Sequence, residues 1–324
     1  MHKIIRGLHN LPQQPLGCVA TIGNFDGIHI GHQAVLTQLV DKGKALGLPS
    51  VVITFEPQAN EFFARQAQAP ARLSRFRDKV VALSQYGIHT LCVLRFNRAL
   101  ANLSANHFIH RLLVTGLAVR YLVVGDDFRF GKGREGDFTL LVAAGKQYGF
   151  EVVNMATFTL ADKRVSSTRI RHALADNNLQ QVQALLGQPY TISGRVTHGD
   201  KKGRTIGFPT ANVPLRRRTT PLHGVYVVQV AGIEEGVSYY GVANVGTRPT
   251  VSQQQTPLLE VHLLSFSGDI YGRYIQVSFL APIRREQQFA SLDALTEQIR
   301  QDCEMAREYI ADNDLFQPTM MELL

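Results

Sequence analysis

The sequence predicts two domains of different fold classes, an α/β domain followed by a mainly β domain. In the first half, short β-branched and apolar runs alternate with segments of helical spacing, whereas strand-like runs follow one another directly in the second half. The chain has 324 residues, of which 45% are hydrophobic and 19% charged. At about 150 residues per domain, this is enough apolar material for two packed cores.

The strand-like runs of the first half are short and end at Gly or polar residues, and helical segments lie between them. Such alternation is typical of a parallel sheet that is covered by helices on both faces. The expected strands are residues 19–22, 51–55, 90–94, 121–124 and 151–155. The expected helices are residues 32–46, 77–86, 105–114 and 138–148.

The second half contains strands without helical crossovers, which predicts an antiparallel sandwich or a small barrel. A helical pattern over residues 292–309 follows the last strand. A helix stops on Gly and Pro near Leu186–Pro189, so we expect domains at 1–186 and 187–324. The expected strands are residues 190–196, 224–230, 239–245, 258–264 and 275–279.

Charge and cysteine content restrict the class of protein less sharply. Lys and Arg number 34 against 26 Asp and Glu, and the net charge of +8 suits a polyanionic ligand or simply a basic enzyme. The three cysteines are far apart and lack metal-ligand spacing, which favours a reducing cytoplasm. No apolar run approaches the roughly 18 residues of a membrane helix, and the first seven residues lack the apolar stretch of a secretory signal.

The segment Gly23–His32 carries the first candidate site. It follows a strand and opens a helix, which is where ligands bind in open α/β sheets. His29 and His32 are three residues apart, so both rings can face one phosphate at the helix N-terminus. Imidazoles can there stabilise charge on a phosphoryl group. Zinc ligation is the alternative, although no Cys or third His has suitable spacing.

Two further segments have the same character, and a third does not. Residues 124–131 follow another strand, and Lys163–Arg171 opens a later helix with hydroxyl and cationic side chains, although Ser-Ser-Thr alone is commonly an N-cap. Gly131–Gly136 matches the dinucleotide pattern G-x-G-x-x-G, with Glu151 beyond it. That pattern requires a strand leading directly into the first Gly, so we interpret 131–136 as a loop near the site.

The second domain carries another polar, glycine-rich segment, residues 198–212. Its glycines and cations can surround a polyphosphate, and Thr210 and Asn212 offer neutral oxygens for Mg²⁺, although Gly-Phe-Pro-Thr alone could be a turn. Downstream lie residues 241–250 and then Glu260, which without other information would be a solvent-facing strand residue. We expect Arg216–Arg218 to lie in a solvated loop.

The segments Gly23–His32, 124–131 and Lys163–Arg171 resemble the His-x-Gly-His nucleotidyltransferase superfamily. The segments of the second domain resemble riboflavin kinase. From about residue 3 to 310, the chain is similar to the bacterial bifunctional riboflavin kinase/FMN adenylyltransferases (FAD synthetases). The resemblance implies a Rossmann-like nucleotidyltransferase domain and a small antiparallel Greek-key barrel with a C-terminal helix. It also implies a cytoplasmic enzyme that uses riboflavin, FMN, ATP and Mg²⁺, with no nucleic-acid or membrane partner.

The resemblance also implies roles for individual residues. In the first domain, His29 and His32 match residues that stabilise the transition state of adenylyl transfer. In the second, Glu260 matches the base that takes the proton of the ribityl 5′-hydroxyl, and Arg284 matches a flavin contact. Thr210 and Asn212 match the Mg²⁺ and ATP-phosphate residues. The other implied ATP and phosphate contacts are Gly23, Asn24, Phe25, Asp26, Asp127, Arg164, Ser167, Thr168, Arg171, Gly199, Gly203 and Arg204.

The chain departs from the family pattern at two places. Gln58-Ala59 stands where the family often has His-Pro, and Ser265-Phe266 stands where it commonly has Asp-Phe. Two other functions remain open at this point. One is an adenylyltransferase for another phosphorylated substrate, with a regulatory second domain. The other is a basic flavin- or RNA-binding module without catalysis.

Overall fold

A computed structural model describes residues 1, 3–12, 16–64, 69–125, 127–155, 157–199, 203, 206–215, 217, 219–249 and 255–315. It divides into two compact units, residues 1–70 with 74–167 and residues 71–73 with 168–324. Within the described residues, every helix is too short or too polar to cross a membrane.

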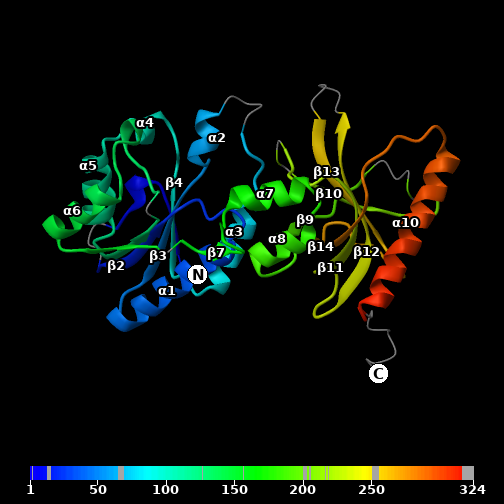
Figure 1. Cartoon of the computed structure of the whole chain (residues 1–324), viewed down its shortest axis with the longest axis horizontal. Helices are drawn as coiled ribbons and strands as arrows, with labels where there is room; N and C mark the ends of the chain where they lie inside the picture. The colour runs from blue at the N-terminus through cyan, green and yellow to red at the C-terminus, as the bar shows by residue number, and fades with distance from the viewer. Residues whose placement is uncertain are drawn as a thin grey trace. The chain divides into compact units, whose positions relative to one another are not determined.

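The first unit is built on a six-stranded sheet whose neighbouring strands are all parallel, in the order β1-β4-β3-β2-β5-β6. From β2, the strands β3 and β4 follow on one side and the strands β5 and β6 on the other. The direction in which successive strands are added therefore reverses between β2 and β5. Figure 1 shows this unit. The strands are β1 (Lys3–Arg6), β2 (Cys18–Ile22), β3 (Ser50–Phe55), β4 (Thr90–Leu94), β5 (Val119–Val124) and β6 (Glu151–Asn154).

Both faces of this sheet are covered, as alternation of strand and helix predicts. Cys18, Ala20 and Ile22 of β2 pack into one apolar core, whereas Val19 packs into the other, because successive side chains point to opposite faces. The first core is covered by α5 (Ala105–Phe108), the π-helix η2 (Ile109–Gly116) and α6 (Phe138–Tyr148), and the second by α1 (Ile30–Leu46) and α3 (Phe76–Gln85).

Several short elements of this unit were not predicted. β1 has four residues and a single buried side chain, so its periodicity is too brief to detect. The helix expected over 105–114 is divided into α5 and the π-helix η2. The other short elements are η1 (Leu8–Asn10), α2 (Ala59–Phe63), α4 (Arg98–Ala101), η3 (Lys132–Arg134), β7 (Thr159–Leu160) and β8 (Lys163–Arg164).

The second unit is a six-stranded antiparallel sheet in the order β10-β13-β12-β11-β14-β9. The consecutive strands β11, β12 and β13 are neighbours and β14 returns beside β11, which is the Greek-key arrangement. Thr197, just after β9, donates its N–H to Asn212 O of β10 at 2.8 Å, which joins the two edges into a barrel. The strands are β9 (Thr191–Arg195), β10 (Ala211–Pro214), β11 (Gly224–Ala231), β12 (Ser238–Pro249), β13 (Gln255–Leu263) and β14 (Tyr274–Arg284).

The helices of this unit whose bounds lie within the described residues are α7 (Ser167–Ala175, of which Ser167 belongs to the first unit), α8 (Leu179–Leu186) and the C-terminal α10 (Leu292–Asp312). Cys303 and Ala306 of α10 pack with Val225, Val227 and Val242 of the barrel. The long helix therefore covers one outer face of the strands (Figure 1). The expected final helix is confirmed, three residues longer than its sequence pattern.

Candidate active sites

The loop after β2 holds the first site in a strained backbone conformation. Phe25 and Ile28 have positive φ angles of 47° and 37°, and such conformations cost about 1–3 kcal/mol each for residues with a side chain. Both side chains are buried in the core beneath α1. Burial of a large apolar side chain contributes about 1.5–3 kcal/mol, which is enough to hold the loop in this shape.

Asp26 uses its carboxylate to fix this loop. It is 1% exposed, and its Oδ1 accepts hydrogen bonds from Ser74 N at 3.0 Å and from Ser74 Oγ at 3.4 Å. Its backbone O accepts from Ser167 Oγ at 2.8 Å. Gly23 continues the β2–β3 pairing, because its N–H donates to Ile53 O. Ser167 is thereby brought to the loop from the start of α7.

His29 and His32 form one stacked pair. Their ring centroids are 3.7 Å apart with an interplanar angle of 12°. His29 is the N-cap of α1, and its Nδ1 accepts the backbone N–H of His32 at 3.2 Å. A neutral imidazole that accepts at Nδ1 carries its proton on Nε2. The capping bond therefore leaves His29 with one ring N–H donor.

The surroundings keep both rings neutral at pH 7. The pKa of His29 is lowered to about 4, mainly by burial and also by the Arg164 cation, against the opposing effects of its own backbone and of Asp26. Burial also lowers the pKa of His32 well below its ordinary value, with smaller effects of His29 and of the buried Lys79 cation. His32 Nδ1 is buried and has no hydrogen-bond partner among the described residues.

Arg164 and Asp127 also meet at this site. Arg164 Nη2 lies 2.8 Å from Asp127 Oδ2, although the two residues are 37 positions apart in the chain. Both side chains are exposed, so the pair contributes at most about 1 kcal/mol and can open for a ligand. Thr168 and Arg171 lie on α7 in the second unit, where Arg171 Nε donates to Ala71 O at 2.6 Å.

The alternatives for the first site find little support. Among the residues that the structure describes, no group of three His, Cys, Asp or Glu could hold a metal ion, so the zinc interpretation gains no third ligand. β5 ends at Val124, well before Gly131, and Glu135 accepts the backbone N–H of Ala105 at 2.7 Å. Residues 131–136 are therefore a connection that contains η3 and is anchored on α5, without the strand that dinucleotide binding requires.

The second site is a row of polar side chains across the barrel strands. Glu260 on β13 is the register partner of Asn212 on β10 and of Asn244 on β12. Cross-strand partners point to the same face, so two amides flank one carboxylate. The Oδ1 atoms of both amides are buried and have no hydrogen-bond partner in the described part of the chain.

A pocket of about 350 Å³ lies between this row and α10, and we call it the α10 pocket. Glu260, Asn244 and Arg284 line it, together with Gly203 and Thr210. Its remaining lining is largely apolar or aromatic, and a flat aromatic ligand suits such a pocket. The lining includes Ile206, Phe208, Phe289, Leu292, Leu295 and Ile299.

Sequence reasoning gave no role to several residues of the α10 pocket, among them the polar residues Asn244, Glu286 and Asp302. Asn244 lies within a segment that was noted, and its pairing with Glu260 requires the strand register. Burial raises the pKa of the Glu286 carboxyl, with a further contribution from Glu260, against the opposing effects of His223 and Arg284. Asp302 carries no signal in the sequence, because its helix is otherwise an ordinary amphipathic one.

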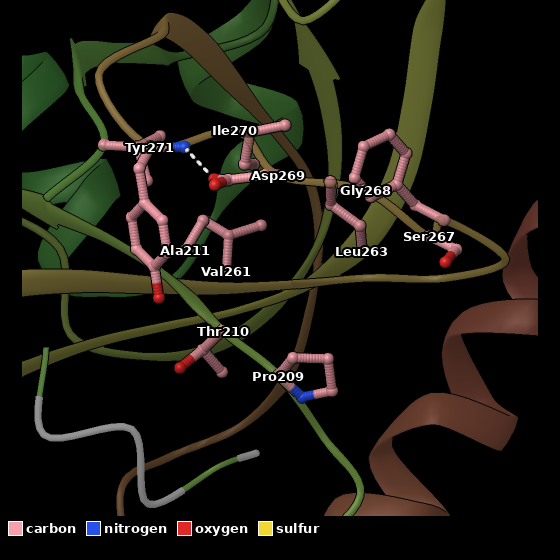
Figure 2. Close-up of a pocket in the computed structure, with 12 residues that line it drawn as sticks. Pro209, Thr210, Ala211, Val261, Leu263, Ser267, Gly268, Asp269, Ile270 and Tyr271 are labelled. Atoms are coloured by element: carbon pink, nitrogen blue, oxygen red, sulfur yellow. Dashed lines mark hydrogen bonds between the residues drawn. The ribbon is translucent and has the colours of Figure 1, made fainter. Parts of the chain in front are cut away.

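A second pocket, of about 270 Å³, opens on the other face of β13 and is shown in Figure 2; we call it the Tyr271 pocket. Val261 and Ala211 line it, whereas their neighbours Glu260 and Asn212 belong to the row on the opposite face. The backbone N–H of Tyr271 donates to Asp269 Oδ1 at 2.8 Å (Figure 2). Thr210 is common to the linings of the two pockets.

Two glycines of the predicted phosphate loop, Gly199 and Gly203, have close neighbours. A Cβ at Gly199 would lie 2.5 Å from Asn212 Nδ2, and one at Gly203 would overlap Phe208 O. Arg204 lies outside the described residues. Arg217 was expected in a solvated loop, but it is partly buried. Its Nη1 donates a hydrogen bond to Arg72 O at 2.9 Å.

Comparison with known proteins assigns both parts of the chain. Residues 11–169 match the family model for FAD synthetase, and residues 186–310 match that for riboflavin kinase. The chain is 55% identical over 310 residues to the bifunctional riboflavin kinase/FMN adenylyltransferase of Escherichia coli K12, covering 95% of this chain and 97% of the relative. The chain belongs to the bifunctional riboflavin kinase/FMN adenylyltransferase family.

Other relatives agree with this family. The riboflavin kinase/FMN adenylyltransferases of Pseudomonas fluorescens and Haemophilus influenzae are 50% and 48% identical, and each alignment covers 95% of this chain and at least 98% of the relative. A crystal structure described as a macrolide-efflux protein from Streptococcus pneumoniae has a TM-score of 0.79 and 30% identity, covering 95% of this chain and 99% of that one. That description names another activity, and it is said of that protein alone.

Proposed function

We propose that the two activities of the family reside at the two sites described above, adenylyl transfer at the loop after β2 and riboflavin phosphorylation beside Glu260. The proposal assigns residues 1–186 to adenylyl transfer and 187–324 to the kinase. The row of Asn212, Glu260 and Asn244, of which Glu260 and Asn244 line the α10 pocket, supports it most strongly. One carboxylate flanked by acceptor amides suits a reaction that deprotonates an alcohol beside a polyphosphate.

In the kinase reaction, Glu260 takes the proton of the ribityl 5′-hydroxyl as its oxygen attacks the γ-phosphorus of ATP. The bond between the γ-phosphorus and its bridging oxygen breaks, and ADP leaves. We place the isoalloxazine ring in the α10 pocket, because the lining is largely apolar, and the nucleotide in the Tyr271 pocket. Thr210 lines both pockets, so the phosphoryl group would cross beside it.

Thr210 and Asn212 would hold Mg²⁺ in this proposal. Mg²⁺ prefers oxygen ligands and usually completes its shell with substrate phosphates and water, so two neutral protein oxygens fit. The buried Asn212 Oδ1 has no partner among the described residues, which agrees with an oxygen kept for a ligand. When bound, the ion would neutralise phosphate charge.

In adenylyl transfer, a phosphate oxygen of FMN attacks the α-phosphorus of a second ATP, and pyrophosphate leaves. His29 Nε2–H donates to the phosphoryl oxygens as negative charge grows on them. Arg164 exchanges its exposed partner Asp127 for phosphate. Asp26 acts indirectly, because its carboxylate is buried against Ser74 and holds the loop in place.

Aromatic side chains at the same sheet edge offer a surface for the flavin of FMN. Phe62 and Phe63 of α2 lie 5.4 Å and 5.6 Å from the Phe96 ring, which follows β4. Phe63 is 68% exposed, which is unusual for so large an apolar side chain. Sequence reasoning assigned no role to these rings.

A time course with riboflavin, ATP and Mg²⁺, with the flavins separated by chromatography, tests the proposal. The appearance of FMN first and FAD later would support both sites. If riboflavin is not converted but supplied FMN is converted to FAD, the chain is an adenylyltransferase with a regulatory second domain. Glu260→Gln should lower the kinase rate by about 10²–10⁴ and leave FMN adenylylation unchanged, because the general base is lost at one site only. Equal loss of both activities would refute two separate sites.

The proposal also places the enzyme in the cytoplasm, without a nucleic-acid partner. All three cysteines are buried and unpaired, which suits a reducing compartment. Failure to convert either flavin, together with RNA binding that weakens steeply with salt, would favour a binding module instead.

A further inference from the structure

The inner face of α10 carries a buried charge that its packing does not require. Asp302 is 1% exposed and lies beside Cys303 on the face that packs on the barrel. A buried carboxylate must be paired, and apolar residues of similar volume often stabilise a fold as well as a buried ion pair does. The buried charge at Asp302 therefore suits a role besides stability.

The partner of Asp302 is Arg284, at the end of β14. Arg284 Nε lies 2.8 Å from Asp302 Oδ1, and Arg284 Nη2 lies 2.8 Å from Asp302 Oδ2, so the carboxylate binds the guanidinium in a bidentate manner. Gln298, one turn earlier on α10, donates to Asp302 Oδ1 at 3.1 Å. Such a planar pair of hydrogen bonds fixes the orientation of the guanidinium as well as its position.

Two more contacts hold the same guanidinium. Arg284 Nη1 donates to Arg285 O at 3.1 Å, and the guanidinium carbon lies 5.6 Å from the centre of the Phe289 ring. Of the five N–H groups of an arginine, Asp302 and Arg285 together engage three. Each Nη therefore keeps one N–H without a partner in the described residues, and Arg284 lines the α10 pocket.

We propose that Asp302 is a positioning residue of the kinase reaction, which orients Arg284 so that its two remaining N–H groups donate to the carbonyl-bearing edge of the isoalloxazine ring. This inference rests on the proposed flavin site in the α10 pocket. The ring has an apolar body and an edge of carbonyl oxygens and nitrogens. The apolar side chains of the pocket suit the body, and a fixed pair of donors suits the edge.

Substitution of each partner, with riboflavin and ATP titrated separately, tests the proposal. Asp302→Asn keeps the shape but removes the charge that orients Arg284. We expect the KM for riboflavin to rise about tenfold or more, because charge-assisted hydrogen bonds to the ring are misdirected. The KM for ATP and the rate of FMN adenylylation should stay unchanged. Glu304→Gln is the matched control, since Glu304 pairs with Arg300 on the exposed side of α10.

A double variant separates positioning from folding. Arg284→Met with Asp302→Leu replaces the ion pair by apolar side chains and should fold even if Asp302→Asn does not. It should raise the KM for riboflavin as much as Arg284→Met alone, because Asp302 acts only through Arg284. A lower melting temperature of Asp302→Asn with an unchanged KM would overturn the proposal, and so would a normal KM in Arg284→Met.

One further variant distinguishes a failure of the flavin site itself. Leu295→Ala removes an apolar side chain from the α10 pocket, and Leu295 is not among the residues that hold Arg284. If the wild-type chain phosphorylates riboflavin but neither Leu295→Ala nor Arg284→Met changes its KM, the flavin binds elsewhere and the proposed site is wrong. If Leu295→Ala raises the KM and Asp302→Asn does not, the site stands and the role of Asp302 is refuted.

Discussion

His29 has two tasks that substitution can separate. Its Nδ1 accepts the N–H of His32 at 3.2 Å and caps α1, and its Nε2–H, which has no partner among the described residues, can donate to a phosphoryl group. His29→Asn keeps a good N-cap acceptor but removes the ring donor. His29→Ala removes both the N-cap acceptor and the ring donor. Comparison of the two variants therefore separates the loss of stability from the loss of catalysis.

The magnitudes follow from these two contacts. Loss of one donor to a transition-state oxyanion costs about 2.7–4 kcal/mol, so both variants should lower the kcat of FMN adenylylation by about 10²–10³. Loss of an N-cap costs about 1 kcal/mol. His29→Ala should therefore melt about 2–4 °C below His29→Asn, the shift that 1 kcal/mol gives in a domain of 150–250 residues.

Chromatographic measurement of FAD formed from FMN and ATP gives the first quantity, and circular dichroism on heating gives the second. Riboflavin phosphorylation is the internal control and should be unchanged in both variants. A wild-type adenylylation rate in His29→Asn would refute the donor role. Equal melting temperatures of the two variants would refute the capping role.

Three further predictions concern the same two sites. Because burial lowers the pKa of His29 from 6.5 to about 4, the unfolded chain binds the proton first as the pH falls. The unfolding free energy should therefore decline by up to about 3 kcal/mol between these values, and less in His29→Asn, as urea unfolding at several pH values would reveal. Gly31→Ala places a Cβ 3.3 Å from His29 Nδ1, so adenylylation should slow about tenfold while the kinase rate, measured on the same preparation, stays constant. Asn244→Ala removes the amide beside Glu260 and should slow riboflavin phosphorylation alone by about tenfold; a normal rate would exclude Asn244 from the site.

Much of the first site can be predicted from the sequence, because its residues are close together in the chain. Gly23–His32 forms one continuous strand-to-helix turn, so the spacing of its histidines already places both rings at one helix end. The alternation of strands and helices likewise predicts the parallel sheet, because each crossover lies within a short stretch of chain.

The sequence predicts only part of the second site. Thr210 and Asn212 lie in one segment, but the row that flanks Glu260 depends on which strands pair and in which register. Register is set by the packing of the whole barrel, and a shift by one residue would turn Asn244 to the other face. No local pattern could therefore assign Asn244 to the site.

The sequence by itself determined the fold class, the two motif sets and the chemistry that they can perform. Only the tertiary structure decided which distant groups meet: Arg164 with Asp127, Asp302 with Arg284, and Thr210 with two pockets at once. The physical reason is the range of the interactions. Backbone propensity and spacing act over a few residues, whereas burial, charge pairing and strand register bring together residues that are far apart in the chain.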